Sequence, residues 1–367
     1  MQTTLSIAQM QRHLIDMSDS SDSSGVSIGS TPSMGPSITT LDSLNICVTT
    51  PDSMGPCTTT PEEFELVLRR HSLTLSDLFS IHDFLIFIAR KAGEMMYSAD
   101  PCVSTSSAKR NTSDLVTATD KAIEEMITLQ LQAKYPQIHF LGEESFSSQK
   151  LTDRPTFICD PIDGTLNFIH GFPNIAVSLA LTIEKKPVVG VVYNPFRGDL
   201  YTAIKGQGAY LTTSNGHIRR LPLRSKPAPL TSLNGCLVAM EWGSERQGPN
   251  WDLRTSMSKA LMSSKASGGA MSHSIRSSGS AALDFCYVAA GQIDVFWEGG
   301  CWIWDVCAGW IILEEAGGLV ASANPGDWEP QLEGRLYLAV RVAEKEGQQR
   351  VVEELWALME NKKFVFI

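Results

Sequence analysis

The chain has 367 residues, of which 43% are hydrophobic and 19% charged, a balance typical of a globular protein with a large buried core. Its formal net charge of −10 at pH 7 argues against a nucleic-acid-binding protein, because such proteins usually present a basic face to the phosphates. Residues 1–17 lack the basic segment and apolar stretch of a secretory leader, and the longest apolar run, residues 84–89, is too short to cross a bilayer. We therefore expect a cytoplasmic protein that binds neither nucleic acid nor membrane.

The cysteines are scattered along the chain and form no C-x-x-C pair that would indicate a zinc site. We expect them to be reduced thiols, most of them buried in the core. They are Cys47, Cys57, Cys102, Cys159, Cys236, Cys286, Cys301 and Cys307.

The amino-terminal part of the chain has the composition of a disordered segment. Residues 17–60 are rich in Ser, Thr, Pro, Gly and Asp and almost free of aromatic residues, so they cannot bury enough surface to offset the entropy of ordering. We expect residues 1–60 to form a disordered tail and residues 61–367 to form one folded domain. The tail contains Thr-Pro steps that match proline-directed phosphorylation sites, and a linker of no consequence is the alternative. These steps begin at Thr31, Thr50 and Thr60.

The first half of the folded part is expected to be helical. The sequence Thr60-Pro61-Glu62-Glu63 predicts a capped helix start. An apolar stripe predicts a longer helix from about Ser76 to Met95, and helical spacing predicts a third helix over residues 121–134.

From residue 156 the pattern changes to short apolar runs that predict strands, with two later helices around a further strand. Mixed strands with flanking helices indicate an α/β or α+β fold built in layers. The expected strands cover residues 156–159, 176–183, 188–193, 200–203, 208–211 and 295–298, and the expected helices cover residues 280–290 and 305–315.

Two aspartates follow the first of these strands on a rigid turn, in the segment Asp160-Pro161-Ile162-Asp163-Gly164-Thr165. Pro161 fixes φ, Gly164 allows close backbone approach to a ligand, and Thr165 adds a hydroxyl. Hard cations such as Mg²⁺ bind one or two carboxylates together with substrate phosphate, so this turn is a candidate metal site. The alternative for the aspartate pair alone is a solvated turn.

Residues 160–173 resemble the signature of the inositol monophosphatase family, which contains lithium-sensitive, Mg²⁺-dependent phosphatases. Residues 114–120, 142–145, 276–282 and 304–318 resemble the other motifs of this family, in the family's order. The resemblance implies an αβαβα sandwich and hydrolysis of a small polyol monophosphate, with inositol monophosphate as the first candidate, by metal-activated water. It also implies two or three Mg²⁺ ions and a homodimer.

The resemblance further implies individual roles. Glu143, Asp160 and the Ile162 carbonyl correspond to the ligands of a first metal. Asp160, Asp163 and Asp305 correspond to those of a second. Thr165, Asp120 and Glu143 are the expected catalytic residues, with Asp120 orienting Thr165 toward the attacking water. The expected substrate-binding residues are Gly164, Thr165, Gly279, Ser280, Ala281, Glu298 and Asp305.

Several of these residues have a simpler interpretation. Asp120 and Asp305 stand where helix caps are expected, and capping is compatible with a role in the site. Glu143 and Glu144 form a strand end or a solvated pair. Lys109 corresponds to a mobile loop of the family, with a solvent-exposed lysine as the alternative. Asp114, five residues later, has either a local structural role or a role at a third metal.

Other functions remain open at this point. Related phosphatases act on nucleotide bisphosphates, fructose bisphosphate or histidinol phosphate, and some fungal relatives are linked to quinate use. The continuation at residues 167–171 favours the inositol branch over the first two. A non-catalytic regulatory protein on the same fold would be expected to lack a metal carboxylate, and none is missing. Residues 241–274 depart from the family in length and composition, and they precede the expected substrate-binding residues.

Overall fold

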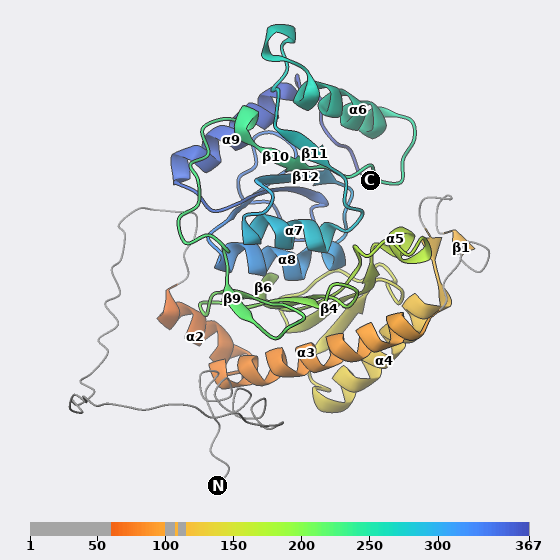
Figure 1. Cartoon of the computed structure of the whole chain (residues 1–367). Coiled ribbons are helices and arrows are strands. Elements are labelled where there is room, and N and C mark those ends of the chain that lie inside the picture. Colours follow the sequence, from red (N-terminus) through yellow and green to blue (C-terminus); the bar gives the residue numbers. More distant parts are fainter. Residues whose placement is uncertain (1–59, 100–106, 109–114, 367) are drawn as a thin grey trace, which may run out of the picture. The chain divides into compact units, whose positions relative to one another are not determined.

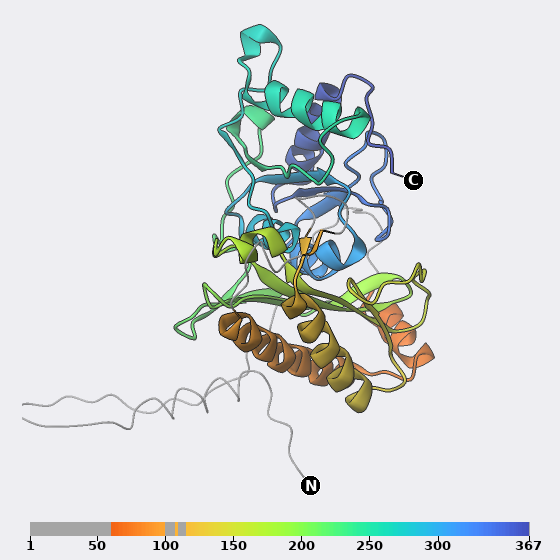
Figure 2. The ribbon, with the colours of Figure 1, turned by 90° about the vertical axis from the view of Figure 1, so that its right-hand side faces the viewer.

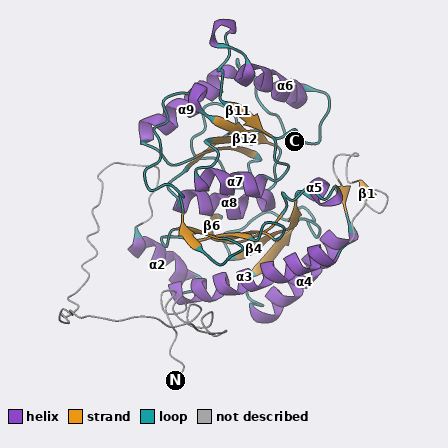
Figure 3. Ribbon diagram, viewed as in Figure 1, coloured by secondary structure: helices purple, strands orange, loops and turns teal. Residues whose placement is uncertain are grey.

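The computed structural model describes residues 60–99, 107–108 and 115–366. Most of the expected tail, including Thr31 and Thr50, lies outside the described residues, as do Lys109 and Asp114. Within the described ranges the chain alternates helical and sheet layers, in the order helices, sheet, helices, sheet, helices (Figure 1, Figure 2 and Figure 3). The expected αβαβα sandwich is therefore confirmed.

The first layer contains α2 (Pro61–Arg70), α3 (Leu75–Ser98) and α4 (Ala118–Lys134). Each begins after a threonine whose hydroxyl accepts from the third residue of the helix, which in turn binds the cap through its carboxylate. These capping boxes satisfy the free N–H groups of a helix start. The apolar faces of α3 and α4 pack on one side of the larger sheet.

The larger sheet has seven strands in sequential order, and all neighbours are antiparallel except the first pair, which is parallel. Its central strands are buried along their whole length because helices cover both faces. The strands are β3 (His139–Gly142), β4 (Thr156–Asp163), β5 (Ala176–Ile183), β6 (Lys186–Asn194), β7 (Asp199–Ile204), β8 (Ala209–Thr212) and β9 (Ile218–Arg220).

The middle layer consists of α7 (Ala281–Ala290) and α8 (Ile303–Glu315), which lie between the two sheets (Figure 1). Close approach is possible because of glycine: a Cβ on Gly190 would lie 2.5 Å from the Ala308 carbonyl oxygen of α8. The position of α8 matters for function because its first turn faces the end of β4.

The smaller sheet has five strands in the order β11-β10-β12-β14-β13. Outer helices α6 and α9 cover it and bury a third apolar cluster. Its strands and the covering helices are β10 (Leu237–Ala239), β11 (Ser274–Arg276), β12 (Val295–Gly299), β13 (Leu319–Ala321), β14 (Leu336–Val340), α6 (Pro249–Met262) and α9 (Lys345–Leu358). The short elements are β1 (Ser107–Ala108), which pairs with β2 (Leu115–Val116), the helix α5 (Thr165–Ile169), and the 3-10 helices η2 (Leu233–Gly235) and η3 (Lys265–Ser267).

Three of the boundaries that differ from the sequence-based prediction affect residues of the candidate site. Strand β4 was expected to stop before Pro161 but continues to Asp163, because a shift in its pairing with β5 between Asp160 and Asp163 accommodates a residue that has no N–H. Helix α4 begins at Ala118 and α8 at Ile303, each earlier than expected. Asp120 and Asp305 are therefore first-turn residues and not the N-cap residues themselves, but each carboxylate accepts the N–H of the N-cap residue, so a capping role is retained.

Two further predictions concern thiols and membranes. The cysteines in the described ranges, Cys159, Cys236, Cys286, Cys301 and Cys307, are buried and unpaired, as expected. Among the described helices, none alone has the length and apolar character to cross a bilayer, whereas α2 and α3 pass that test only as a pair bent by 77°.

Candidate metal centre and active site

Three aspartates from two separate elements meet at the junction between the larger sheet and the middle helices. Asp160 and Asp163 lie at the end of β4, and Asp305 lies in the first turn of α8. One carboxylate oxygen from each lies within 4.8 Å of the others. Asp305 lies 142 positions after Asp163 and 145 positions after Asp160 in the sequence, yet the three residues form one cluster of carboxylate oxygens. Hard divalent cations prefer such oxygen ligands.

The local fold explains how two aspartates of one strand point to the same place. In a regular strand, residues three apart face opposite sides of the sheet. The pairing shift between Asp160 and Asp163 removes this alternation, and the Ile162 N–H donates to Asp160 Oδ1 at 3.0 Å. Gly164 follows with φ of 94° and begins α5, a conformation that favours glycine.

Asp163 is held by the start of α7. Its Oδ2 accepts a hydrogen bond from Ser280 Oγ at 2.5 Å and another from the Ala282 N–H at 2.8 Å. Ser280 is the helix cap and also accepts from the Leu283 N–H. The amino end of α7 therefore fixes one carboxylate oxygen of Asp163.

Asp305 is oriented by its own helix start. The Trp302 N–H donates to Asp305 Oδ2 at 2.7 Å, and the Trp304 carbonyl accepts from Ser178 Oγ on β5 at 3.0 Å. The second contact ties the start of α8 to the larger sheet, close to the end of β4. This tie keeps Asp305 in register with Asp160.

The electrostatics of the cluster favour a cation. Burial raises the pKa of Asp160 well above its usual range, and the charges of Glu143, Asp163 and Asp305 raise it further. Burial followed by the Asp163 charge raises the pKa of Asp305 in the same way. Burial also raises the pKa of Asp163 to about 6, although hydrogen bonds from Ser280 and Ala282 oppose this shift. A divalent cation would relieve both the burial and the repulsion, so these residues fit such an ion.

Glu143 lies beside the cluster without being one of its three members. It follows β3, its N–H donates to the Cys159 carbonyl at 3.1 Å, and its charge is the largest charge effect on Asp160. The next turn is held by a residue that the sequence analysis missed: buried Glu124 accepts from the N–H groups of Glu144 at 2.8 Å and Ser145 at 2.7 Å.

Thr165 and Asp120 meet as expected from the resemblance. Thr165 Oγ1 lies 3.1 Å from Asp120 Oδ1 and 3.1 Å from the Ile162 carbonyl oxygen, so its single proton has two acceptors within reach. Asp120 is also held by the Thr117 N–H at 2.9 Å and by the Thr117 hydroxyl. Burial raises the pKa of Asp120, and the hydrogen bonds from Thr117 oppose the shift.

The loop before α7 carries the expected substrate-binding backbone and is clamped from both sides. Glu241 Oε1 accepts from the N–H groups of Ser278 at 2.5 Å and Gly279 at 2.9 Å. On the other side, Asn167 and Asn174 each donate to the Ser278 carbonyl, at 2.8 Å and 3.0 Å. Asn167 stood within the family-like signature, whereas Glu241 belongs to no motif and gave no signal in the sequence.

Glu298 lies near the end of β12 and is 7% exposed. Its pKa is raised to about 8, chiefly by burial and next by the Glu241 charge, while the Arg254 charge opposes the rise. The Asp163 charge also acts on it, which places Glu298 on the side of the cluster formed by the smaller sheet. Its carboxyl can therefore exchange a proton near neutral pH.

The structure places some of the expected site residues in direct contact with one another and others beside the aspartate cluster. The structure brings Asp160, Asp163 and Asp305 into one cluster, joins Thr165 to Asp120 and to the Ile162 carbonyl, and packs Ser280 against Asp163. Gly164 approaches the same loop, because a Cβ there would lie 3.0 Å from the Gly279 carbonyl oxygen. Ala281 opens α7, and Glu143 and Glu298 flank the cluster.

Comparison with known proteins identifies the family. A family model described as the inositol monophosphatase family matches residues 77–361. Inositol monophosphatase 2 of Saccharomyces cerevisiae is 49% identical over 255 residues, which cover 68% of this chain and 83% of the yeast protein. The quinic acid degradation cluster protein x of Neurospora crassa is 37% identical over 325 residues, covering 77% and 94% of the two chains.

A solved structure has the same fold. The extragenic suppressor protein suhB from Bartonella henselae superposes with a TM-score of 0.61 and 30% identity. The match covers 77% of this chain and 100% of the bacterial one.

Proposed function

The chain belongs to the inositol monophosphatase family, and on this basis we propose that it is a Mg²⁺-dependent phosphatase that converts inositol monophosphate to inositol and phosphate. The observation that carries the proposal is the convergence of Asp160, Asp163 and Asp305 on one cluster, in which the first two are buried and Asp305 is partly buried. Burial and mutual repulsion disfavour the ionised form of these carboxylates, and a bound cation would offset both effects. A divalent cation held by such carboxylates can also bind a substrate phosphate.

Two or three Mg²⁺ ions are the proposed cofactors. Asp160, Asp163, Asp305, Glu143 and the Ile162 carbonyl are the proposed ligands. When bound, Mg²⁺ supplies positive charge that neutralises phosphoryl oxygens and acidifies water. The oxygen-only donor set and the raised pKa values of Asp160 and Asp305 support this choice.

Thr165 and Asp120 are proposed to orient the attacking water. With Thr165 donating to Asp120 Oδ1, the lone pairs of the threonine oxygen are free to accept a hydrogen bond from water. A proton can then pass from water to Thr165 Oγ1 as the threonine proton moves to Asp120 Oδ1. The raised pKa of Asp120 makes it a better proton acceptor than an ordinary aspartate.

The polyol is proposed to bind between the start of α7 and the end of β12. The backbone of Gly279, Ser280 and Ala281 lies at a helix start, and a substrate would compete with Glu241 for the Gly279 N–H and with the Ser278 hydroxyl for the Ser280 N–H. Glu298 offers carboxyl oxygens that accept hydrogen bonds from hydroxyl groups. A substrate with a neutral, hydroxyl-bearing ring fits beside an acidic side chain better than a bisphosphate does, because Glu298 would repel a second phosphate.

The second candidate is a related phosphatase of the same superfamily, acting on a nucleotide bisphosphate, on histidinol phosphate or on a substrate linked to quinate use. The relative named for quinic acid degradation aligns over most of its length, which favours this candidate beyond the family match. A test is phosphate release by the full chain from inositol 1-phosphate, adenosine 3',5'-bisphosphate, fructose 1,6-bisphosphate and histidinol phosphate, with Mg²⁺ and with EDTA. Preference for inositol 1-phosphate that disappears in EDTA supports the proposal. Equal or greater turnover of another substrate would favour the second candidate.

The homodimer and the cytoplasmic location stay predictions. The division into a tail over residues 1–60 and a catalytic domain from residue 61 is likewise a prediction. Light scattering on the purified chain tests the dimer, and deletion of residues 1–60 with measurement of turnover tests the division.

A further inference from the structure

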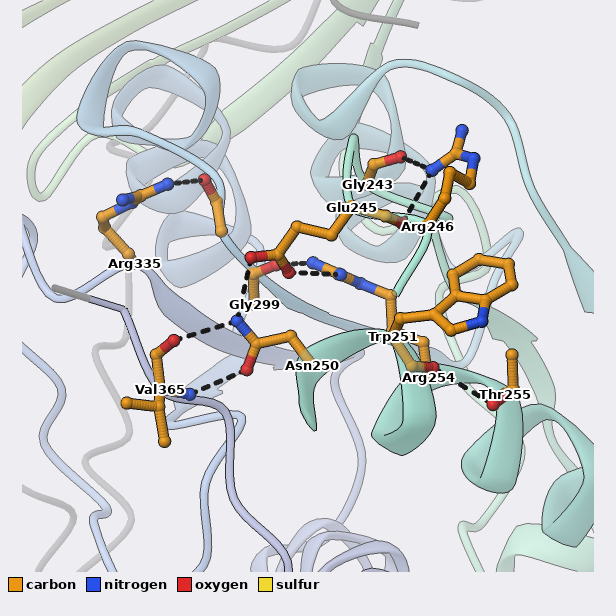
Figure 4. Close-up of polar contacts among 11 residues, drawn as sticks. Gly243, Glu245, Arg246, Asn250, Trp251, Arg254, Thr255, Gly299, Arg335 and Val365 are labelled. Atoms are coloured by element: carbon orange, nitrogen blue, oxygen red, sulfur yellow. Dashed lines mark hydrogen bonds and ion pairs between the residues drawn. The ribbon is translucent and has the colours of Figure 1, made fainter. Parts of the chain in front are cut away.

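Arg254, on helix α6, is a buried arginine that joins three segments around the end of β12 (Figure 4). Its side chain is 3% exposed, its Nη1 lies 3.2 Å from Glu245 Oε2, and its Nη2 donates to the Gly299 carbonyl at 2.6 Å. Its Cζ lies 5.1 Å from the centre of the Phe364 ring. A buried guanidinium requires such partners, so its position is well determined.

The carbonyl that Arg254 binds belongs to the residue directly after Glu298. Strand β10 pairs with β12 only as far as Phe296, whereas β14 pairs with β12 as far as Gly299. The last residues of β12, Glu298 among them, therefore have a strand on one side only. Arg254 supplies a hydrogen bond at the point where the second strand is missing.

The guanidinium cannot shift without displacing its surroundings. A Cβ on Gly243 would lie 2.7 Å from Arg254 Cζ, and a Cβ on Gly299 would lie 2.5 Å from the Phe364 ring. Packing this close leaves room for glycine only, so the loop at residue 243 and the carboxyl-terminal segment close around the arginine.

Asn250 links this enclosure to the carboxyl-terminal segment. Its Nδ2 lies 3.3 Å from Glu245 Oε1 and donates to the Val365 carbonyl at 2.9 Å, while the Val365 N–H donates to Asn250 Oδ1 at 2.9 Å (Figure 4). Asn324 makes the same pair of bonds with Phe364, at 3.0 Å and 2.8 Å. Phe364, whose ring covers Arg254, is thus held through its own backbone by Asn324 and through the backbone of Val365 by Asn250.

We propose that Arg254 is a positioning residue for the polyol: by holding the Gly299 carbonyl it fixes the end of β12 and with it the direction in which Glu298 meets the substrate hydroxyls. The inference rests on the proposed function, in which Glu298 accepts hydrogen bonds from the polyol. It also gives a role to residues 241–274, the part of the chain that departs most from the family pattern, because they contribute both Arg254 and its partner Glu245. The Arg254 charge favours the ionised form of Glu298, in the same direction as a hydrogen bond with Cys301.

The test compares two substrates that share the phosphate but differ in hydroxyl groups. Arg254→Gln is expected to raise KM for inositol 1-phosphate about tenfold, which is the effect of losing one charge-assisted hydrogen bond between Glu298 and a substrate hydroxyl. The same change is expected to alter KM for p-nitrophenyl phosphate less than about twofold. Arg246→Gln is the matched control, because Arg246 is exposed and bonds to Gly243 and Glu245 but not to β12. The control is expected to leave both KM values unchanged.

A double-mutant cycle separates positioning from a general structural role. In an enzyme that already carries Glu298→Gln, the added Arg254→Gln change is expected to raise KM for inositol 1-phosphate no further. A full additional tenfold rise, or equal losses with both substrates, would overturn the inference.

If Arg254→Gln does not fold, Arg254→Lys keeps the charge but cannot bind Glu245 and Gly299 in the same geometry. It is expected to show the same split between substrates at smaller size, and an equal loss on both substrates would again overturn the inference. Failure of the proposed function has a different signature, in which the unmodified enzyme hydrolyses p-nitrophenyl phosphate but no polyol phosphate.

Discussion

Replacement of Asp163 by asparagine is expected to stabilise the metal-free protein and to remove most of its response to Mg²⁺. The pKa of Asp163 rises from 3.8 to about 6, chiefly through burial. A shift of about 2 pH units corresponds to about 3 kcal/mol against the ionised form near neutral pH. Asparagine keeps an oxygen that can accept from Ser280 and Ala282, so most of this cost is relieved without loss of those bonds.

The free energy of unfolding gained by Asp163→Asn is expected to depend on pH. Folded Asp163 binds its proton more tightly than the unfolded chain does, so its contribution to stability is complete below about pH 4 and is lost as pH rises through about 6. Asp163→Asn has no such dependence. The expected gain in free energy of unfolding is therefore about 1–3 kcal/mol at pH near 7.5 and close to zero at pH near 4.

Denaturant unfolding in EDTA at both pH values measures this gain, and repetition with Mg²⁺ measures the response to metal. At about a hundred times its Kd, a cation bound only by the folded state adds about 2.7 kcal/mol, which the unmodified protein should gain and the variant should largely lack. Asp199→Asn is the control, because Asp199 is also partly buried with a raised pKa but lies on β7, outside the cluster. A variant that is less stable in EDTA near pH 7.5, or that gains as much from Mg²⁺ as the unmodified protein, would refute this reasoning.

Three further predictions concern turnover. Asp160→Asn should lower Mg²⁺-dependent phosphate release more than about a hundredfold with an unchanged circular dichroism spectrum, because charge neutralisation by the metal is worth several kcal/mol; near-normal rates would contradict the ligand assignment. Thr165→Val should lower kcat by about a hundredfold or more if the hydroxyl orients water, whereas Thr182→Val, which removes a buried hydroxyl from β5, should affect stability alone. Equal kcat values for these two variants would exclude that role. Gly279→Ala should raise KM, because the backbone φ at this residue is 78° and the new Cβ would lie 2.6 Å from the side-chain nitrogen Nδ2 of Asn167. Gly216→Ala has nearly the same φ of 79° with nothing within 4 Å, so matching KM values for the two alanine variants would argue against a substrate-positioning loop.

Local pattern was enough to predict the elements that border the site. Helical periodicity and capping signals predicted α2, α3 and α4, and apolar runs predicted the central strands of the larger sheet. Strands β10, β11 and β13 are only three residues long, which is too short for an alternating pattern to stand out. The order of the five layers came from the family resemblance, because periodicity carries no information on which faces pack together.

The site was predictable where its residues lie in contiguous motifs, as Asp160, Asp163 and Asp305 do. It was not predictable where a side chain acts through a contact between distant segments. Glu241 binds backbone 37 and 38 positions away, and Arg254 binds a carbonyl 45 positions away. Such partners are chosen by tertiary packing, which leaves no periodic or compositional trace in the sequence.

Anomalous diffraction from crystals soaked in Mn²⁺, a substitute for Mg²⁺ at oxygen-rich sites, tests the central claim most directly. The account predicts peaks in contact with the carboxylates of Asp160, Asp163 and Asp305, and loss of those peaks in the Asp160→Asn variant. An enzyme that hydrolyses inositol 1-phosphate while its crystals show no cation between these three carboxylates would contradict it.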